Sequence, residues 1–276
     1  MVQQAQGEYD VKFLCELLQL QRSSFYYTST VADDLYLIEA IEEICLKQTR
    51  YGYRRVTDRL HRAGIAVDKE RVRSLMREMG LSVRPLRRKI QTTQSKKGKA
   101  LYPNLIKNLE IVRPNQVWCG DITFIPLAKG KTVYLAILID IFTRAIRGWK
   151  LDTNMSEQLV DRALDVALAK GISPEIHHSD HGGQYIALGY CDRLIALNCQ
   201  ISMAGKAKPW ENPYAESVIG HIKDELVWTE EFTDFQHAYN SLSHFLDVEY
   251  NYERSHSSLG YLTPVEFEAQ YHEPQS

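Results

Sequence analysis

Residues 132–140 carry the pattern that most limits the fold of this chain: Thr-Val-Tyr-Leu-Ala-Ile-Leu-Ile-Asp, a run that is almost entirely apolar. It is too short to cross a membrane, which takes ~20 apolar residues. A run of this length instead matches a β-strand that is buried on both faces. Such a strand lies inside a sheet whose two sides are covered, so the run predicts an α/β domain.

The residues around this run supply the rest of such a domain. Apolar patterns predict further strands over 116–127, 145–151, 175–179 and 200–203, with a Gly-containing turn at 128–131. They predict helices over 156–170, 189–197 and 213–228. Three antiparallel strands followed by alternating helices and parallel strands have the order of an RNase H-like fold, a mixed sheet flanked by helices.

The charge of the chain is divided unevenly along its length. Lys and Arg total 33 against 35 Asp and Glu, which gives a net charge of only −2. Residues 1–112 nevertheless carry 20 basic and 13 acidic side chains, whereas residues 113–276 carry 13 and 22. Between residues 50 and 99 the counts are 16 and 4. A charge run is often only a solvated surface, but this one favours nucleic acid as a partner.

The basic part of the chain is predicted to be helical. Apolar spacing predicts helices within 10–27, over 33–48, from the motif at 51–55 to Gly64, and over 69–79 with Asp68 as its cap. The residues expected to face inward are Val56, Leu60, Ala63, Val72, Leu75 and Met76. Those expected to face outward are Arg54, Arg55, Arg59, Arg62, Arg71, Arg73 and Arg77. Two short helices with a tight turn and an arginine-rich second helix have the layout of a helix-turn-helix; an ordinary helical hairpin is the alternative.

A basic segment follows these helices. Residues 84–99 carry seven cations, no acids and little apolar periodicity. We interpret the segment as a linker whose cations bind DNA phosphates, with an affinity that falls as salt rises; they include Arg87, Arg88, Lys89, Lys96 and Lys97. The predicted organisation is a helical DNA-binding region at 1–83, a basic linker at 84–112 and an RNase H-like domain at 113–272.

Three acids occupy positions where α/β domains place chemistry. Asp180 follows the strand at 175–179 and precedes two glycines, Asp121 lies on the strand at 116–127, and Glu216 opens the helix at 213–228. Fifty-eight residues separate the first two acids and thirty-five separate the last two. One such acid alone is more often a surface or capping residue. Together they offer the oxygen ligands that Mg²⁺ prefers, and without a cation their repulsion predicts a loose or partly protonated site.

The motifs around these acids resemble a known signature. They read Trp118-x-x-Asp121-Ile122-Thr123, His178-Ser179-Asp180-His181-Gly182-Gly183-Gln184-Tyr185 and Asn212-x-x-Ala215-Glu216-Ser217, with Lys223 seven residues after the Glu. They are similar, spacing included, to the D-D-E signature of retroviral-integrase-type catalytic domains. The resemblance extends over about residues 31–271 to the second-frame (OrfB) transposases of bacterial insertion sequences; its further motifs are Tyr51-Gly52-Tyr53-Arg54-Arg55, Met79-Gly80-Leu81 and Asn251-Tyr252-x-Arg254-x-His256-x-x-Leu259-Gly260-Tyr261-x-Thr263-Pro264.

This resemblance implies a DNA transposase that cleaves and joins element ends by phosphoryl transfer. Asp121, Asp180 and Glu216 would hold Mg²⁺, for which Mn²⁺ could substitute. Lys223 and Asn212 would contact DNA, although a solvated lysine and a helix cap are the alternatives. The implied partners are double-stranded DNA, further copies of the chain assembled on it, and a first-frame protein that acts separately or as a fusion.

Several assignments stay open at this level. His178 and His181 either assist at the site or pack its loop, and Arg254 and His256 are expected to brace the carboxyl-terminal helix. The family usually has Asp-Asn-Ala before the Glu, where this chain has Glu211-Asn212-Pro213. Two alternatives to a transposase are a DNA-binding regulator with an inactive integrase fold and an RNase H-like nuclease that does not join DNA.

The composition bears on the compartment. The amino terminus lacks the basic and apolar regions of a secretory signal, and the five cysteines form no Cys-x-x-Cys pair. No zinc-binding His-His-Cys-Cys set is present before residue 113. We therefore expect a cytoplasmic, nucleoid-associated protein with no membrane partner.

Overall fold

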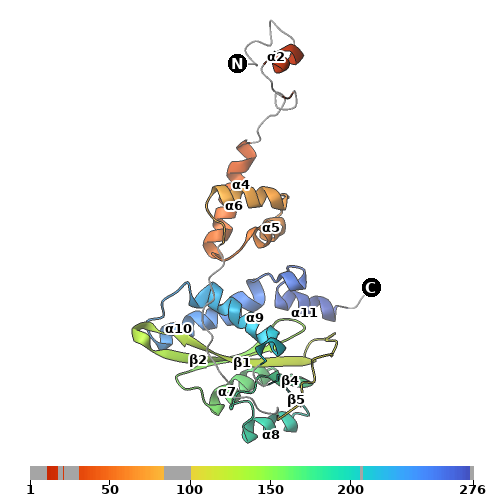
Figure 1. The fold of residues 1–276 in the computed structure, drawn as a ribbon, viewed down its shortest axis with the longest axis vertical. Coiled ribbons are helices and arrows are strands. Elements are labelled where there is room, and N and C mark those ends of the chain that lie inside the picture. Colours follow the sequence, from red (N-terminus) through yellow and green to blue (C-terminus); the bar gives the residue numbers. More distant parts are fainter. Residues whose placement is uncertain (1–10, 18–20, 22–30, 84–100, 206–207, 274–276) are drawn as a thin grey trace.

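A computed structural model describes residues 11–17, 21, 31–83, 101–205 and 208–273. A group of amino-terminal helices precedes a sheet domain that has helices on both of its faces (Figure 1). The predicted helix pair of the basic region and the predicted α/β domain are both present. The linker residues 84–99, and the expected helical residues 22–27, lie outside the described part of the chain.

The sheet has five strands in the order β3-β2-β1-β4-β5. They are β1 (Val117–Pro126), β2 (Thr132–Asp140), β3 (Ile146–Asp152), β4 (Ile176–Ser179) and β5 (Gln200–Met203). β1 pairs antiparallel with β2 and β2 with β3, whereas β4 is parallel to both β1 and β5. This order confirms the predicted RNase H-like arrangement, and β2 begins and ends where the apolar run does.

Two cores fill the two faces of the sheet. Alternate side chains of β1 enter different cores, with Cys119 and Ile125 on one side and Trp118 on the other. The first core includes residues of α9 (Pro213–Ile222) and α10 (Phe235–Ser243), and the second those of α7 (Glu157–Leu168) and α8 (Leu188–Ala196). Figure 1 shows these helix pairs on opposite faces of the sheet. Residues 105, 106, 109 and 111 also pack against the first core.

The amino-terminal helices have a small core of their own. Residues of α4 (Val31–Lys47), α5 (Tyr53–Arg62) and α6 (Lys69–Glu78) form this core, and α2 (Val11–Leu17) precedes these three helices in the chain. The Asp68 side chain caps α6 by accepting a hydrogen bond from the Glu70 N–H, as predicted. The predicted inward residues are buried except for Ala63, which is exposed. The prediction was wrong at Ala63 because α5 ends at Arg62, so the inward-facing row does not continue to the next residue.

The carboxyl-terminal helices depart from regular α-geometry. The helix predicted over 213–228 is α-helical only to Ile222 and continues as a π-helical turn, Lys223–Val227. Likewise α10 continues as a π-helical segment, His244–Glu253, before α11 (Pro264–His272) closes the domain. Pro213 occupies the first turn of α9, as predicted. No helix in the described part of the chain is both long and apolar enough to span a membrane.

Candidate active site

The three predicted site acids lie on neighbouring elements. Asp121 is one residue beyond Gly120, which pairs with Ser179 of β4, and Asp180 directly follows that same Ser179. The two acids therefore occupy equivalent places just past the paired part of β1 and β4. Glu216 lies in the first turn of α9, a helix that contacts β1.

The start of α9 is fastened to β1 by a side chain. Asn212 is buried at the N-cap position, but its side chain makes no capping hydrogen bond. Its Nδ2 instead donates to the Gly120 carbonyl oxygen over 3.3 Å. This contact ties the helix that carries Glu216 to the residue before Asp121. The side-chain Oδ1 of Asn212 is buried and has no hydrogen-bond partner.

Asp121 is the most perturbed of the three carboxyls. The residue is half-buried, and its Oδ1 accepts a hydrogen bond of 2.7 Å from the Ile122 N–H. Desolvation, together with the negative charges of Asp180 and Glu216, raises its pKa to about 7 despite that bond and the positive charge of Lys223. Asp121 therefore lies close enough to each of the other two acids to be affected by its charge.

Asp180 is held by the glycine loop that follows it. Its Oδ1 accepts a hydrogen bond of 2.9 Å from the Gly182 N–H. A Cβ at Gly182 would lie 3.0 Å from that same oxygen, so a side chain there would crowd the carboxylate. The residue as a whole is exposed, yet desolvation raises the pKa of its carboxyl above the ordinary value.

Lys223 approaches the same region from the end of α9. Its Nζ lies 4.0 Å from the centre of the Phe124 ring on β1, a cation–π contact. Desolvation lowers the pKa of Lys223, and the charge of Asp121 acts in the opposite direction. Lys223 and Asp121 thus interact electrostatically, although no ion pair joins them.

The acids fit a hard divalent cation in chemistry. Within the described ranges, no three His, Cys, Asp or Glu side chains are close enough together to hold a metal ion without rearrangement. The donors at this edge of the sheet are nevertheless carboxylate oxygens, which Mg²⁺ and Mn²⁺ prefer. Loosely spaced acids and a raised carboxyl pKa agree with the repulsion expected of the site without a cation.

Tyr185 is a site residue that sequence reasoning quoted within a motif but did not assign. Its side chain is buried and its hydroxyl has no hydrogen-bond partner. A Cβ at Gly120 would lie only 3.2 Å from that hydroxyl, so the tyrosine reaches the backbone next to Asp121. The signal that could have identified it is Gly120 itself, a glycine inside a buried strand where another group approaches closely.

The two histidines of the Asp180 loop differ in their surroundings. His178 is fully buried, with its Nδ1 2.8 Å from the Ser202 hydroxyl and its Nε2 3.1 Å from the Glu211 carbonyl oxygen. Desolvation lowers the pKa of His178 to about 4. Both ring nitrogens are used inside the protein, which favours the packing alternative. His181 is half-buried, and its Nε2 has no partner.

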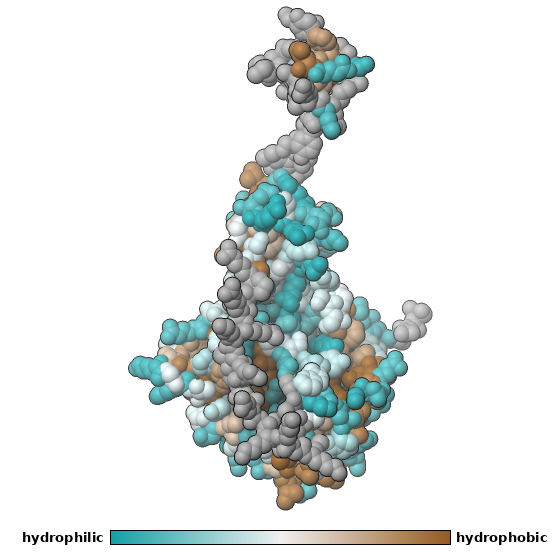
Figure 2. All heavy atoms as spheres, in the orientation of Figure 1, coloured by the Kyte–Doolittle hydropathy of each residue, from teal (hydrophilic) through white to brown (hydrophobic). Residues whose placement is uncertain are grey.

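The arginines predicted to contact DNA also fall into two groups. Arg54 and Arg77 are exposed, and no ion pair involves either of them within the described residues. Arg55 pairs with Glu225 of the sheet domain, Arg71 with Asp34 and Arg73 with Glu70. Figure 2 shows hydrophilic side chains gathered over the helices α4 to α6. The five cations expected in the linker lie outside the described residues.

Comparison with known proteins identifies relatives of this chain. The chain is 36% identical over 223 residues to the transposase for insertion sequence element IS904 of Lactococcus lactis, which covers 79% of this chain and 87% of that protein. It belongs to the insertion-sequence transposases. The transposase InsF for insertion sequence IS3A of Escherichia coli is 29% identical and covers 97% of the chain and 96% of its own length.

The family models and solved structures agree with this assignment. Integrase core domain models match residues 112–209 and 197–264 of the transposase, and an HTH-like domain model matches residues 32–89. A chain of the simian T-cell lymphotropic virus intasome, solved with a PP2A regulatory subunit, has the same fold at 17% identity. Its TM-score is 0.51, and the match covers 86% of this chain and 75% of that one. None of these relatives supports the regulator alternative.

Proposed function

We propose that this transposase cuts and joins the DNA ends of its element at the edge where β1 and β4 meet α9, with Asp121, Asp180 and Glu216 as its metal ligands. One observation carries this assignment. Asp121 has a pKa raised to about 7 by desolvation and by the charges of the other two acids, and no ion pair of the described residues neutralises any of the three. A carboxyl perturbed by two like charges, beside two further acids that also have no ion-pair partner, supports a site that an external cation completes.

The side chains divide the work of phosphoryl transfer between them. Two divalent cations, when bound, would activate the attacking oxygen and neutralise charge on the leaving oxygen. Asp121 has to lose its proton to become a ligand, and the Gly182 N–H orients Asp180 through the bond to its Oδ1. Lys223, held against Phe124, supplies a positive charge for a DNA phosphate.

DNA reaches this site from the basic part of the chain. We propose that the helical region at 1–83 and the basic residues 84–99 of the predicted linker bind double-stranded DNA mainly through phosphates, whereas residues 105–111 of that linker pack against the sheet domain. Arg54 and Arg77 are exposed on the helices and available for such contacts. Joining two ends to a target requires more than one active site, so we further propose that copies of the chain assemble on DNA, with a first-frame protein as partner or fusion.

The test compares Asp180→Asn with the parent protein on a duplex that contains the element end, with Mg²⁺ or Mn²⁺. Nicking and joining are expected to disappear, while the affinity for the duplex persists. Asp192→Asn is the matched control, because Asp192 is an exposed acid on α8 and pairs with no cation among the described residues. Equal activity of the two variants would overturn the site assignment.

A further inference from the structure

The motif Tyr51-Gly52-Tyr53-Arg54-Arg55 contains two adjacent arginines with different surroundings. Arg54 is exposed, and its guanidinium lies 5.2 Å from the centre of the Tyr53 ring. Arg55 points into the sheet domain, where its Nη1 lies 3.1 Å from Glu225 Oε1. The side chains of Arg55 and Glu225 are only 20% and 11% exposed, so this ion pair is largely shielded from water. One arginine thus faces solvent and the other faces the catalytic domain.

Glu225 is shared with a second, fully buried arginine. Arg254 Nε and Nη2 donate to the two carboxylate oxygens of Glu225, each over 2.7 Å. Burial alone would raise the pKa of Glu225, but the hydrogen bonds and charge of Arg254, with the charge of Arg55, lower it below its ordinary value. Arg254 was expected to brace the carboxyl-terminal helix, but it instead holds the π-helical turn after α9, where Glu225 stays ionised between two cations.

Three more hydrogen bonds join residues in and just before α5 to residues 251–268, which we call the carboxyl-terminal segment. The Tyr51 hydroxyl accepts a hydrogen bond of 3.2 Å from the Ser255 N–H. Arg62 donates through Nη2 to the Tyr261 carbonyl oxygen over 2.6 Å, and through Nη1 to Glu266 Oε1 over 2.8 Å. The motif at 51–55 and the motif at 251–264, 200 residues apart in the chain, thus meet at one interface.

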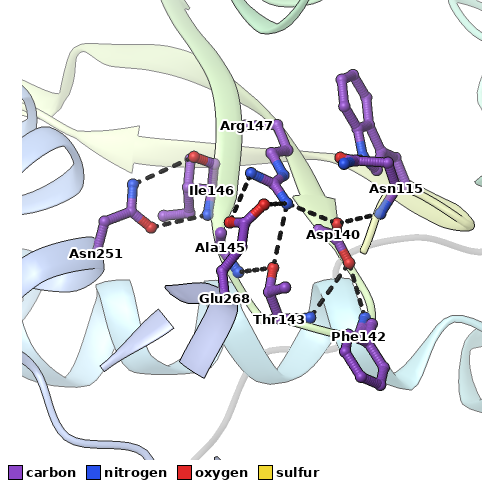
Figure 3. A network of polar contacts seen from close by, with 10 residues as sticks. Asn115, Asp140, Phe142, Thr143, Ala145, Ile146, Arg147, Asn251 and Glu268 are labelled. Carbon is purple, nitrogen blue, oxygen red and sulfur yellow. Dashed lines mark hydrogen bonds and ion pairs between the residues drawn. The ribbon is translucent and has the colours of Figure 1, made fainter. Parts of the chain in front are cut away.

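The same carboxyl-terminal segment also forms hydrogen bonds and ion pairs with the sheet (Figure 3). Asn251 exchanges hydrogen bonds of 3.0 and 3.2 Å with the Ile146 backbone at the start of β3. Arg147 donates to both carboxylate oxygens of Glu268, and also to Asp140, the last residue of β2. The carboxyl-terminal segment therefore contacts the amino-terminal helices through one set of residues and the sheet through another, and so connects the two.

From these contacts we infer that Arg55 is a positioning residue and that only Arg54 of the pair serves DNA. Arg55, Glu225 and Arg254 form an interdomain clasp that fixes the helix-turn-helix region relative to the catalytic domain. Glu225 lies in the π-helical turn that continues α9, two residues after Lys223. The clasp thus links the DNA-binding region to the helix that carries Glu216. The effect on turnover rests on the proposed function, whereas the clasp itself does not.

Two full-length variants, Arg54→Gln and Arg55→Gln, separate these roles, because each removes one positive charge from the same motif. Hydrogen exchange is measured at residues 53–62 and 254–262, alongside DNA affinity as a function of salt. Arg55→Gln is expected to accelerate exchange in both segments roughly tenfold, the size expected for a lost charge-assisted hydrogen bond. Its salt dependence should match that of the parent protein. Arg54→Gln should leave exchange unchanged and reduce the slope of log affinity against log salt by about 1.

Turnover gives a second readout. Arg55→Gln is expected to lower the rate of joining at saturating DNA without changing the DNA concentration at half-saturation, whereas Arg54→Gln should mainly raise that concentration. The exchange measurement is repeated in the Asp180→Asn background, so failure of the proposed catalytic site leaves the test of the clasp intact.

A reduced salt slope for Arg55→Gln would overturn the inference, because Arg55 would then contact phosphate. Unchanged exchange in both segments would overturn it as well. If Arg55→Gln does not fold, Arg55→Lys replaces it. Lysine keeps the charge but not the geometry of the guanidinium. The hydrogen-exchange rates of Arg55→Lys at residues 53–62 and 254–262 should lie between the rate of the parent and the rate of a fully opened interface. Its DNA affinity should depend on salt as that of the parent does. Exchange as slow as in the parent, or a lower salt slope, would refute the clasp.

Discussion

Two groups of acids in the catalytic domain differ in how their charge is balanced. Asp140, Glu225 and Glu268 each form an ion pair with an arginine on another structural element. No Lys or Arg forms an ion pair with Asp121, Asp180 or Glu216 in the part of the chain that the structure describes. The first group therefore helps to hold the fold together, and we propose that the second binds cations from outside.

The pKa values follow the same division. The arginines lower the pKa of Glu225 in spite of its burial, whereas desolvation and like charges raise the pKa of Asp121 to about 7. The raised pKa distinguishes Asp121 from an acid such as Asp192, which is also unpaired within the described residues but is exposed to water. The difference between the groups supports the proposal that the first stabilises the fold and the second binds the catalytic cations.

The largest effect is expected when a site acid loses its charge. Asp180→Asn should lower nicking and joining by at least about 10³-fold, because a lost metal ligand removes several kcal/mol of charge stabilisation in the transition state. Single-turnover assays on an end-containing duplex measure this loss. A decrease no larger than that of Asp192→Asn would place the chemistry elsewhere.

Removing the charge of Asp121 should stabilise the metal-free protein, although it abolishes the proposed metal ligand. Its folded pKa of about 7 lies above the unfolded value of 3.8, so ionisation costs stability progressively as pH rises from about 4 to 7. Asp121→Asn should therefore be more stable than the parent at pH 8, by up to about 4 kcal/mol, and less so at pH 4. Urea unfolding across this pH range tests the sign; parallel stability curves would contradict it.

Substitution of an acid that is paired with an arginine should instead destabilise the protein. Asp140 is completely buried and accepts hydrogen bonds from Arg147 and from three backbone N–H groups. Asp140→Asn is expected to cost about 3 kcal/mol of folding free energy, because Arg147 loses one of its buried partners. Urea unfolding at pH 7 provides the value. A variant as stable as the parent would show that this ion pair contributes nothing to the fold.

The smallest expected effect concerns Tyr185, whose buried hydroxyl has no partner. Tyr185→Phe should stabilise the metal-free protein by about 1 kcal/mol, since it removes an unsatisfied polar group. It should slow joining about three- to tenfold if the hydroxyl acts beside Asp121. Unfolding and single-turnover measurements on the same preparation decide between this role and simple packing, which predicts unchanged joining.

Local sequence signals predicted most elements, because each was encoded by neighbouring residues. The apolar run at 132–140 gave the bounds of β2, and Asp68 the start of α6. The positions of the acids in a strand, after a strand and at a helix start were also predicted correctly, since these are local features, whereas their role as metal ligands stays a prediction.

Tertiary partners could not be predicted in this way. Helical spacing placed Arg54 and Arg55 alike on the outer face of α5, but Glu225, 170 positions away, turned Arg55 into an interdomain contact. The two ring nitrogens of His178 likewise form hydrogen bonds with distant residues, Ser202 in β5 and Glu211 just before α9. The absence of an ion-pair partner for the three acids likewise depends on where distant arginines lie in the folded chain, which local patterns do not specify.

The central claim is that the unpaired acids hold divalent cations, and Mn²⁺ binding tests it most directly. Electron paramagnetic resonance reports free Mn²⁺ during titration of the full-length protein on an end-containing duplex. The parent and Asp140→Asn, which retain the three site acids, should both bind Mn²⁺ at the site. Asp121→Asn and Asp180→Asn should lose that binding while still binding the duplex. Undiminished Mn²⁺ binding by these two variants would contradict the claim.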